Sequence, residues 1–223
     1  MALSVASLAG IIGKEVSEII EIFDYAGIHI VNVDTPLEQR HLQLFLQTIC
    51  KLDEPSVGSK ITKLENDVKV KNRRIFIDTC SLLEDECPKF LDTLIPLLVK
   101  HRVALIVPKR VIDELEKHCH SQDKPQLQKS ARAMLKRIIG LQRLGIIQVF
   151  GDETDNFADN VFISVFSKYR VKYRLMLITQ DNNLAEDILR LNHSKSVKGY
   201  PIKVQRINKN GQLSSYTITD ESG

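Results

Sequence analysis

Four acidic residues fall where predicted strands pass into helices. Asp78 ends one apolar run and Asp181 follows another. Glu114 and Asp159 lie in the first turns of helices that are predicted after two further strands. Because the carboxyl ends of parallel strands open onto one crevice, we expect these four side chains to converge at one edge of a sheet.

Such a convergence has a defined chemistry. Carboxylates held close together repel one another, and a divalent cation removes that cost. Hard oxygen ligands with open water positions suit Mg²⁺ or Mn²⁺, which can activate a water and stabilise charge on a phosphodiester. No cysteine or histidine falls at the four junctions, which argues against zinc. Taken singly, each acid also fits a helix cap or an exposed helix position.

The elements that must position these acids begin at residue 73. Short apolar runs alternate with helical patterns, which predicts an α/β fold with a mainly parallel five-stranded sheet and helices on both faces. A turn at Asn210-Gly211 could add a last hairpin strand. The five expected strands cover residues 73–78, 103–108, 146–150, 175–179 and 201–207.

The first part of the chain has a different character. Apolar residues at helical spacing predict a small helical module over residues 1–52, followed by a polar linker over 53–72 and the α/β domain over 73–223. The segment loosely resembles helix-turn-helix domains and the amino-terminal module of bacterial translation initiation factors. Residues 1–70 carry six basic and ten acidic residues, a net charge of −4. This favours docking to a protein or homodimerisation over direct nucleic-acid binding.

Composition narrows the class further. The chain has 223 residues, of which 43% are hydrophobic and 26% are charged, as is typical of globular proteins. No apolar run reaches the ~20 residues of a membrane-spanning helix. The start of the chain lacks the basic residue of a secretory signal, and the four cysteines form no CxxC pair. We therefore expect a cytoplasmic protein with reduced thiols.

Residues 73–207 resemble the PIN-domain nucleases. The resemblance rests on IFIDTCSLL, VPKRVIDELEKH, ADNVFIS and LMLITQDNNLA, in that order. It implies a metal-dependent endonuclease that acts on single-stranded or structured RNA. The metal and catalytic site that it implies consists of Asp78, Glu114, Asp159 and Asp181.

Three neighbouring residues bear on that assignment. Thr179 matches a small hydroxyl residue that would orient Asp181. Asn183 stands where some members of the family carry an acid, which puts a full second-metal site in doubt. Asp155 is an acid that could compensate, or it could be a solvated loop residue.

Two other readings of the same fold stay open: a non-catalytic PIN-like platform for RNA binding or assembly, and a structure-specific DNA nuclease. Two further α/β classes are excluded. A haloacid-dehalogenase-like phosphatase needs an acid two positions after Asp78, but that position is Cys80. A P-loop or dinucleotide fold needs a glycine-rich turn, and DTCSLLEDE contains no glycine.

Residues 71–223 hold 25 basic and 18 acidic residues, a net charge of +7, so a polyanion is expected to meet this part. The stretch KYRVKYR interleaves basic residues with Tyr169 and Tyr173, which either stack on unpaired bases or pack internally. Basic residues on the predicted helix 125–144 and near residue 195 form either a phosphate track or a solvated face. The candidate nucleic-acid-binding residues are Lys129, Arg132, Lys136, Arg143, Lys195 and Lys198.

Overall fold

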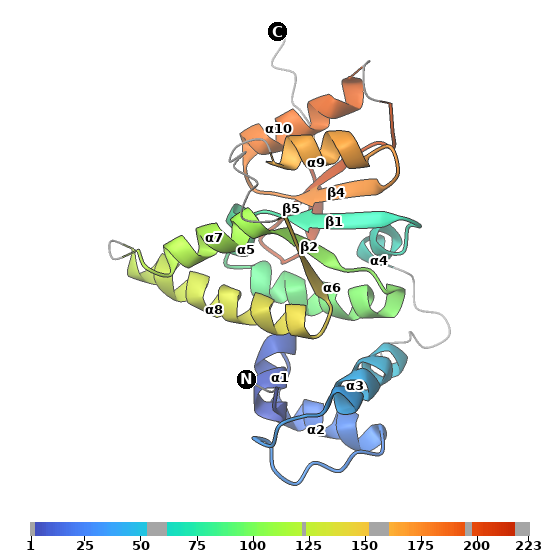
Figure 1. Cartoon of the computed structure of the whole chain (residues 1–223), viewed down its shortest axis with the longest axis vertical. Coiled ribbons are helices and arrows are strands. Elements are labelled where there is room, and N and C mark those ends of the chain that lie inside the picture. The colour runs from blue at the N-terminus through green and yellow to red at the C-terminus, as the bar shows by residue number, and fades with distance from the viewer. Residues whose placement is uncertain (1–2, 53–61, 122–123, 152–160, 195–197, 217–223) are drawn as a thin grey trace.

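A six-stranded sheet lies at the centre of the computed structural model, which describes residues 3–52, 62–121, 124–151, 161–194 and 198–216 (Figure 1). The strand order is β3-β2-β1-β4-β5-β6, and only β6 runs antiparallel to its neighbour. The five predicted strands are present, and the hairpin strand β6 adds one to the predicted count. The bounds are β1 (Arg73–Ile77), β2 (Leu105–Pro108), β3 (Ile147–Phe150), β4 (Arg174–Ile178), β5 (Lys203–Ile207) and β6 (Leu213–Ser215).

The direction of winding reverses between β1 and β4. From β1 the chain moves outward through β2 to β3, then returns to place β4 on the other side of β1 and continues to β5. The two central strands are paired in parallel over their whole length, from Arg73↔Arg174 to Ile77↔Ile178. In open α/β sheets, ligands bind beyond the strand ends at such a reversal.

Helices cover both faces of the sheet, so strand residues that point to either side are buried. Ile75 and Ile77 pack into one apolar cluster, whereas Phe76 packs into another. This explains why the strands read as continuous apolar runs rather than as alternating patterns. The first face carries α5 (Thr79–Leu82), α6 (Cys87–His101), α7 (Lys109–His118) and α8 (Pro125–Arg143). The second face carries α9 (Val161–Tyr169) and α10 (Asn182–Arg190), followed by the short helix η1 (Leu191–His193).

The amino-terminal helices lie behind the first helical layer, on the side away from the sheet (Figure 1). They are α1 (Val5–Ile12), α2 (Val16–Tyr25) and α3 (Gln39–Leu52). Phe23 and Phe45 stack within this part with ring centroids 5.2 Å apart, and both belong to the same apolar cluster as Ile75. The core is therefore continuous from the sheet to these helices.

A fourth helix, α4 (Lys63–Val68), falls in the segment that the sequence predicts as a linker. The carboxylate of Glu65 in α4 is 2.9 Å from Nζ of Lys100 and 3.0 Å from Nε2 of His101, both in α6. These contacts lower the pKa of Glu65, chiefly through the hydrogen bond from Lys100. The described part of the predicted linker is thus fixed to the sheet-bearing body.

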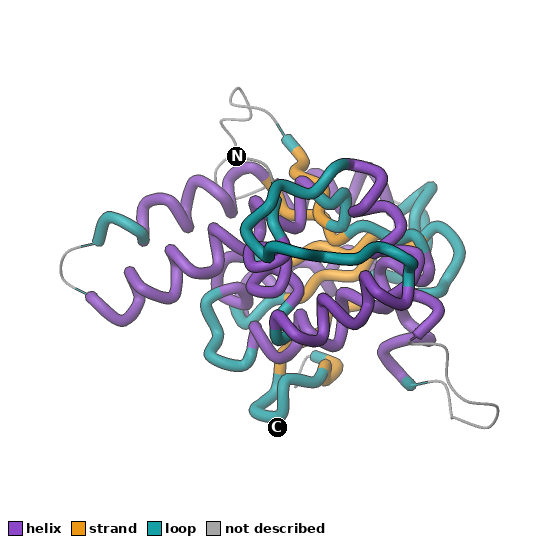
Figure 2. Tube along the Cα trace, turned by 90° about the horizontal axis from the view of Figure 1, so that it is seen from below, coloured by secondary structure: helices purple, strands orange, loops and turns teal. Residues whose placement is uncertain are grey.

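The helices α7 and α8 lie side by side and project beyond the sheet as a helical hairpin (Figure 1, Figure 2). The buried residues of α8 include Ala131, Met134, Ile138 and Leu141, which all lie on one face of the helix. The opposite face carries mostly exposed residues, apart from Gly140, which is buried where α1 packs against α8.

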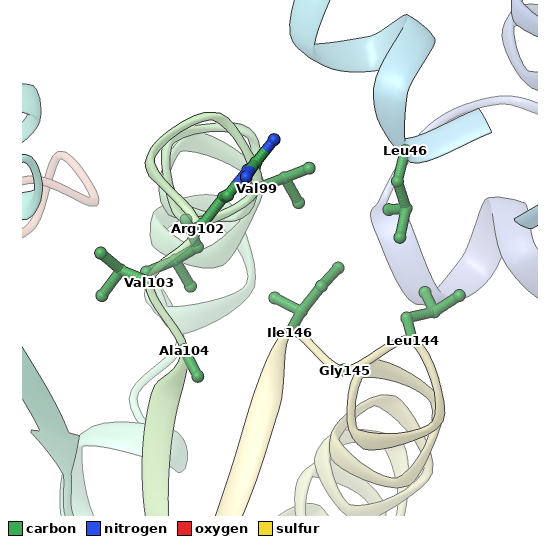
Figure 3. A pocket seen from close by; sticks show the side chains of 9 residues that line it. Leu46, Val99, Arg102, Val103, Ala104, Leu144, Gly145 and Ile146 are labelled. Carbon is green, nitrogen blue, oxygen red and sulfur yellow. The ribbon is translucent and has the colours of Figure 1, made fainter. Parts of the chain in front are cut away.

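A cleft of about 270 Å³ separates α3 from the body of the protein (Figure 3). Its lining is mainly aliphatic, with Leu46 from α3 facing Leu144 and Ile146 across the space. Ala104 and Ile146 immediately precede β2 and β3, so the cleft lies at the amino-terminal edge of the sheet. It is therefore distant from the edge where the acids are expected.

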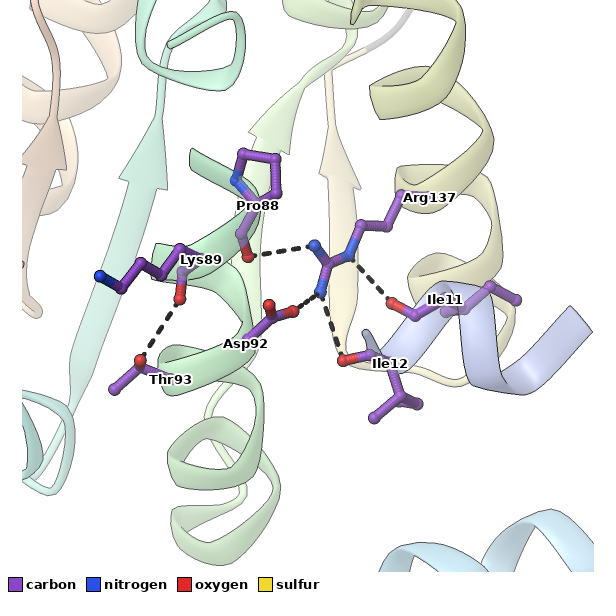
Figure 4. Close-up of polar contacts among 7 residues, drawn as sticks. All are labelled: Ile11, Ile12, Pro88, Lys89, Asp92, Thr93 and Arg137. Carbon is purple, nitrogen blue, oxygen red and sulfur yellow. Dashed lines mark hydrogen bonds and ion pairs between the residues drawn. The ribbon is translucent and has the colours of Figure 1, made fainter. Parts of the chain in front are cut away.

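Arg137 of α8 joins three helices at one point (Figure 4). Its guanidinium donates to the carbonyl oxygens of Ile11 at 2.9 Å and Ile12 at 3.3 Å, which are among the last carbonyls of α1. It also donates to the carbonyl oxygen of Pro88 at 3.1 Å and pairs with the carboxylate of Asp92 in α6. A single side chain thus satisfies carbonyls that a helix end leaves unpaired.

Gly140 allows α1 to approach α8 closely, because a Cβ at this position would overlap the side chain of Ile11. We therefore expect Gly140→Ala to lower the melting temperature, since overpacking of about 1–3 kcal/mol exceeds the ~1 kcal/mol gain in helix propensity. In an Ile11→Ala background the same change should raise the melting temperature. Thermal unfolding of the four proteins in this cycle measures the coupling, and additive effects would contradict the close contact.

Candidate functional site

Two carboxylates flank the reversal point of the sheet. Asp78 directly follows β1 and caps α5, accepting a hydrogen bond from the backbone N–H of Ser81 at 2.7 Å. Asp181 lies beyond the end of β4 and caps α10, accepting from the backbone N–H of Leu184 at 3.1 Å. Because β1 and β4 are neighbours, the fold brings these two predicted site residues to the same edge.

The hydroxyl of Thr179 connects the two acids. Thr179 is fully buried, and its Oγ1 donates to a carboxylate oxygen of Asp78. The same oxygen accepts from the backbone N–H of Asp181 at 3.0 Å. The sequence assigns Thr179 to the orientation of Asp181. In the structure it contacts the backbone of Asp181 and the carboxylate of Asp78.

Glu114 lies in α7, the helix that follows β2, and β2 is the other neighbour of β1. Thr79, the residue after Asp78, donates its hydroxyl to one carboxylate oxygen of Glu114. Arg110 donates from Nε to the other oxygen at 2.8 Å. Neither partner was expected from the sequence, although Arg110 lies one helical turn before Glu114, a spacing that is typical of ion pairs.

Burial controls the electrostatics of Asp78, whose residue surface is only 5% exposed. Loss of hydration raises the pKa of this carboxyl, and the negative charge of Asp181 adds to the rise. Hydrogen bonds from Thr179 and Ser81 act in the opposite direction without cancelling it. An ionised Asp78 is therefore costly in the absence of a positive charge nearby.

The thiol of Cys80 is affected by the negative charges of the same acids. Desolvation by its neighbours raises the pKa of Cys80 to about 11, and the carboxylates of Asp78, Asp181 and Glu114 contribute in that order. A nearby anion disfavours the thiolate, so all three acids act on this one sulfur. Cys80 itself lies at the surface.

The described residues contain no group of three or more His, Cys, Asp or Glu side chains that is close enough to hold a metal ion. Two of the predicted acids, Asp155 and Asp159, lie outside the described residues. Asn183 is exposed in the first turn of α10. The structure thus brings Asp78 and Asp181 to one place, whereas Glu114 is hydrogen-bonded to Thr79 and Arg110. The carboxylate oxygens of Asp78 and Asp181 are ligands of the kind that Mg²⁺ or Mn²⁺ prefers.

The predicted basic residues of α8 lie on the face opposite its buried residues. Lys129, Arg132, Lys136 and Arg143 are all exposed, as is Lys198. Arg132 also donates from Nε to the carbonyl oxygen of Cys119 at 3.1 Å, so it ties α8 to the end of α7. Lys195 lies outside the described residues.

The fold and this edge define an α/β protein with a mainly parallel sheet and two carboxylates at its reversal point. No protein-family model matches the chain, and no curated protein sequence matches it. Within the described ranges, every helix is too short or too polar to span a bilayer.

Proposed function

We propose that the protein is an Mg²⁺- or Mn²⁺-dependent endonuclease that cleaves phosphodiester bonds of single-stranded or structured RNA. The observation that carries this proposal is the buried carboxylate of Asp78 beside Asp181 at the reversal point of the sheet. A carboxylate whose pKa is raised by burial and by a neighbouring acid is suited to a bound cation.

The chain's own residues have separate tasks in this proposal. Asp78 and Asp181 would hold the ion, which would supply positive charge and an activated water when bound. Thr179 fixes the orientation of the Asp78 carboxylate. Arg110 and Thr79 hold Glu114 in place at the rim. Further ligand roles for Glu114 and Asp159 rest on the resemblance to PIN-domain nucleases.

The direct test is incubation of the purified protein with labelled RNA and with labelled single-stranded and branched DNA, in Mn²⁺ or in chelator. We expect Mn²⁺-dependent internal cleavage of RNA and no cleavage in chelator. Cleavage of DNA alone would identify a structure-specific DNA nuclease. Cleavage that persists in chelator would contradict the role of the ion.

One observation favours a second candidate, a non-catalytic platform for RNA binding or assembly. Both carboxylate oxygens of Glu114 are already hydrogen-bonded, to Thr79 and to Arg110. A ligand held in this way has less freedom to bind an ion. Tight RNA binding without cleavage in Mn²⁺ would support the platform.

The basic face of α8 is the proposed contact for the RNA backbone. Because Arg132 also supports α7, the clean variant is Lys129→Glu/Lys136→Glu. We expect it to weaken RNA binding and to flatten its salt dependence, since each phosphate contact contributes about −0.7 to −0.9 to the logarithmic salt slope. Filter binding across a salt series measures both quantities.

A matched control changes the same charge elsewhere. Lys63→Glu/Lys69→Glu alters two exposed lysines of and beside α4. Its effect on the salt slope should be smaller, because this helix lies beside the end of α6, on the side of the molecule away from the projecting α7–α8 hairpin (Figure 1). Equal effects of the two double variants would indicate a general charge effect. The basic face of α8 would then be an ordinary solvated surface and not an RNA contact.

The amino-terminal helices complete the proposal. The exposed residues of α2 include the acids Glu18, Glu21 and Asp24, beside Tyr25, whose surface is 69% exposed. This surface suits a protein partner or a second copy of the chain better than it suits RNA. We place the protein's action in the cytoplasm. Solution mass by light scattering tests self-association directly.

A further inference from the structure

An aromatic groove crosses the second face of the sheet at its β3 edge. Its volume is about 200 Å³, and its lining includes Phe76, Phe150, Tyr169 and Tyr173 together with the polar side chains of Arg74 and Gln148. A cavity of ~150 Å³ is already large enough to bind benzene, so this groove has room for one planar ring.

The rings of the aromatic groove form a connected set. Phe150 meets the edge of Tyr169 with centroids 6.0 Å apart, and Tyr169 lies 6.3 Å from Tyr173. These contacts hold the rings in place beside the exposed Gln148 of the edge strand β3. Ordered rings lose little further freedom when a ligand stacks on them.

Cations surround the same rings. The guanidinium of Arg74 lies 4.6 Å from the centre of Tyr173, and Nζ of Lys172 lies 5.3 Å from it. Nζ of Lys168 lies 5.6 Å from the centre of Tyr169. The described lining contains no carboxylate. A groove that joins aromatic faces to positive charge fits a base attached to a phosphate chain.

The aromatic groove runs along the strands toward the end of the sheet at which Asp78 lies. Arg74 lies near the start of β1, whereas Phe150 is the last residue of β3. Phe150 pairs with Pro108 at the end of β2, and this is the edge where Asp78 follows β1. The end of the groove at Phe150 therefore lies level with the strand end that Asp78 follows.

We propose that the aromatic groove stacks an unpaired base of the RNA strand whose backbone passes the Asp78–Asp181 edge. This inference rests on the proposed ribonuclease function for the identity of its ligand. It assigns the interleaved KYRVKYR segment to substrate binding as well as to packing. It also makes the protein selective for unpaired regions, since a base inside a duplex cannot enter the groove.

The test measures binding, in chelator so that nothing is cleaved, of a labelled single-stranded oligouridylate and of an abasic chain of the same length. Tyr173→Leu should weaken binding of the oligouridylate about tenfold and leave the abasic chain unchanged, because stacking contributes only where a base is present. Tyr173→Phe keeps the ring and should bind like the wild type.

The matched control is Tyr200→Leu. Tyr200 also carries a cation over its ring, with Arg174 at 4.4 Å, but it does not line the aromatic groove. It should bind both chains like the wild type. If Tyr173→Leu fails to fold, Gln148→Ala changes an exposed lining residue and should weaken only the oligouridylate, several-fold.

Three results would overturn the inference: equal loss on both chains, no loss on either, or a wild type that binds both chains alike. Cleavage of the same RNA in Mn²⁺ is scored separately. Base-dependent binding without cleavage would refute the nuclease and leave the groove standing. Cleavage together with RNA binding that is unchanged in Tyr173→Leu would refute only the proposed role of the aromatic groove.

Discussion

Replacing Asp78 or Asp181 by Asn is expected to abolish Mn²⁺-dependent cleavage, with a loss of at least ~100-fold, while the protein stays folded. Each change removes one negative charge from the proposed ion site and keeps the shape of the side chain. Asn still accepts the capping hydrogen bond that Asp78 takes from Ser81. Cleavage rates and circular dichroism measure the two parts of this prediction.

The control is Glu116→Gln, which removes an exposed acid from the same helix as Glu114. It should cleave like the wild type. If both Asn variants also cleave at the wild-type rate, Asp78 and Asp181 are not the site. A further readout is independent of activity: Asp181→Asn should lower the pKa of Cys80 from about 11, as followed by alkylation rate against pH.

The raised pKa of Asp78 determines how its ionisation changes the stability of the protein with pH. Its pKa is higher in the folded protein than in the unfolded chain, so its ionisation destabilises the fold. Below the unfolded pKa of about 4 the carboxyl is protonated in both states and the cost is absent. In chelator, Asp78→Asn should therefore melt at least ~2 °C above the wild type at neutral pH, and this gap should close in acid.

The second large effect is expected from removal of residues 1–54. The fragment 55–223 keeps every strand and both layers of helices, so it should still unfold cooperatively and cleave RNA. Its melting temperature should fall by at least ~5 °C, because α1 and α3 no longer cover α8 and α6. The uncovered apolar face should also promote self-association. Circular dichroism, cleavage rate and light scattering measure these three properties.

Arg137 offers a matched comparison for this deletion. In the full chain Arg137→Gln removes hydrogen bonds to Ile11 and Ile12, whereas in the fragment those acceptors are already gone. The substitution should therefore lower the melting temperature more in the full chain than in the fragment. A fragment without a cooperative melt would show that the first helices are part of the α/β fold and not a separable module.

The sequence predicted the parts of the fold that depend on local pattern. Apolar runs placed the five parallel strands to within about two residues, and Asp78 and Asp181 were correctly expected at strand ends. The side-by-side position of these two acids followed from the topology of parallel sheets. The convergence of Glu114 with them is partial, and that of Asp159 stays a prediction.

Features that depend on tertiary fit were not predictable. Gly140 reads as a weak point inside a long helix, yet it is the contact that admits Ile11. Arg110 lies one turn before Glu114 in the same helix, but the other partner, Thr79, lies in α5, and α5 and α7 meet only after folding. The aromatic groove combines residues from β1, β3, α9 and the approach to β4, and no single segment carries its pattern.

The placement of the amino-terminal helices has a consequence for assembly. They lie behind α6 and α8 (Figure 1), whereas the lining of the aromatic groove includes Phe76 and other residues of the apolar cluster on the opposite face of the sheet. Under the proposed function, a protein docked on α2 and an RNA base in the aromatic groove would lie on opposite sides of the sheet, so both could be bound at once. Tethering of this kind raises the effective concentration of a second ligand without any new contact. Under the proposed function the protein would then act as a bivalent adaptor, with a protein partner on one side of the sheet and an RNA strand on the other.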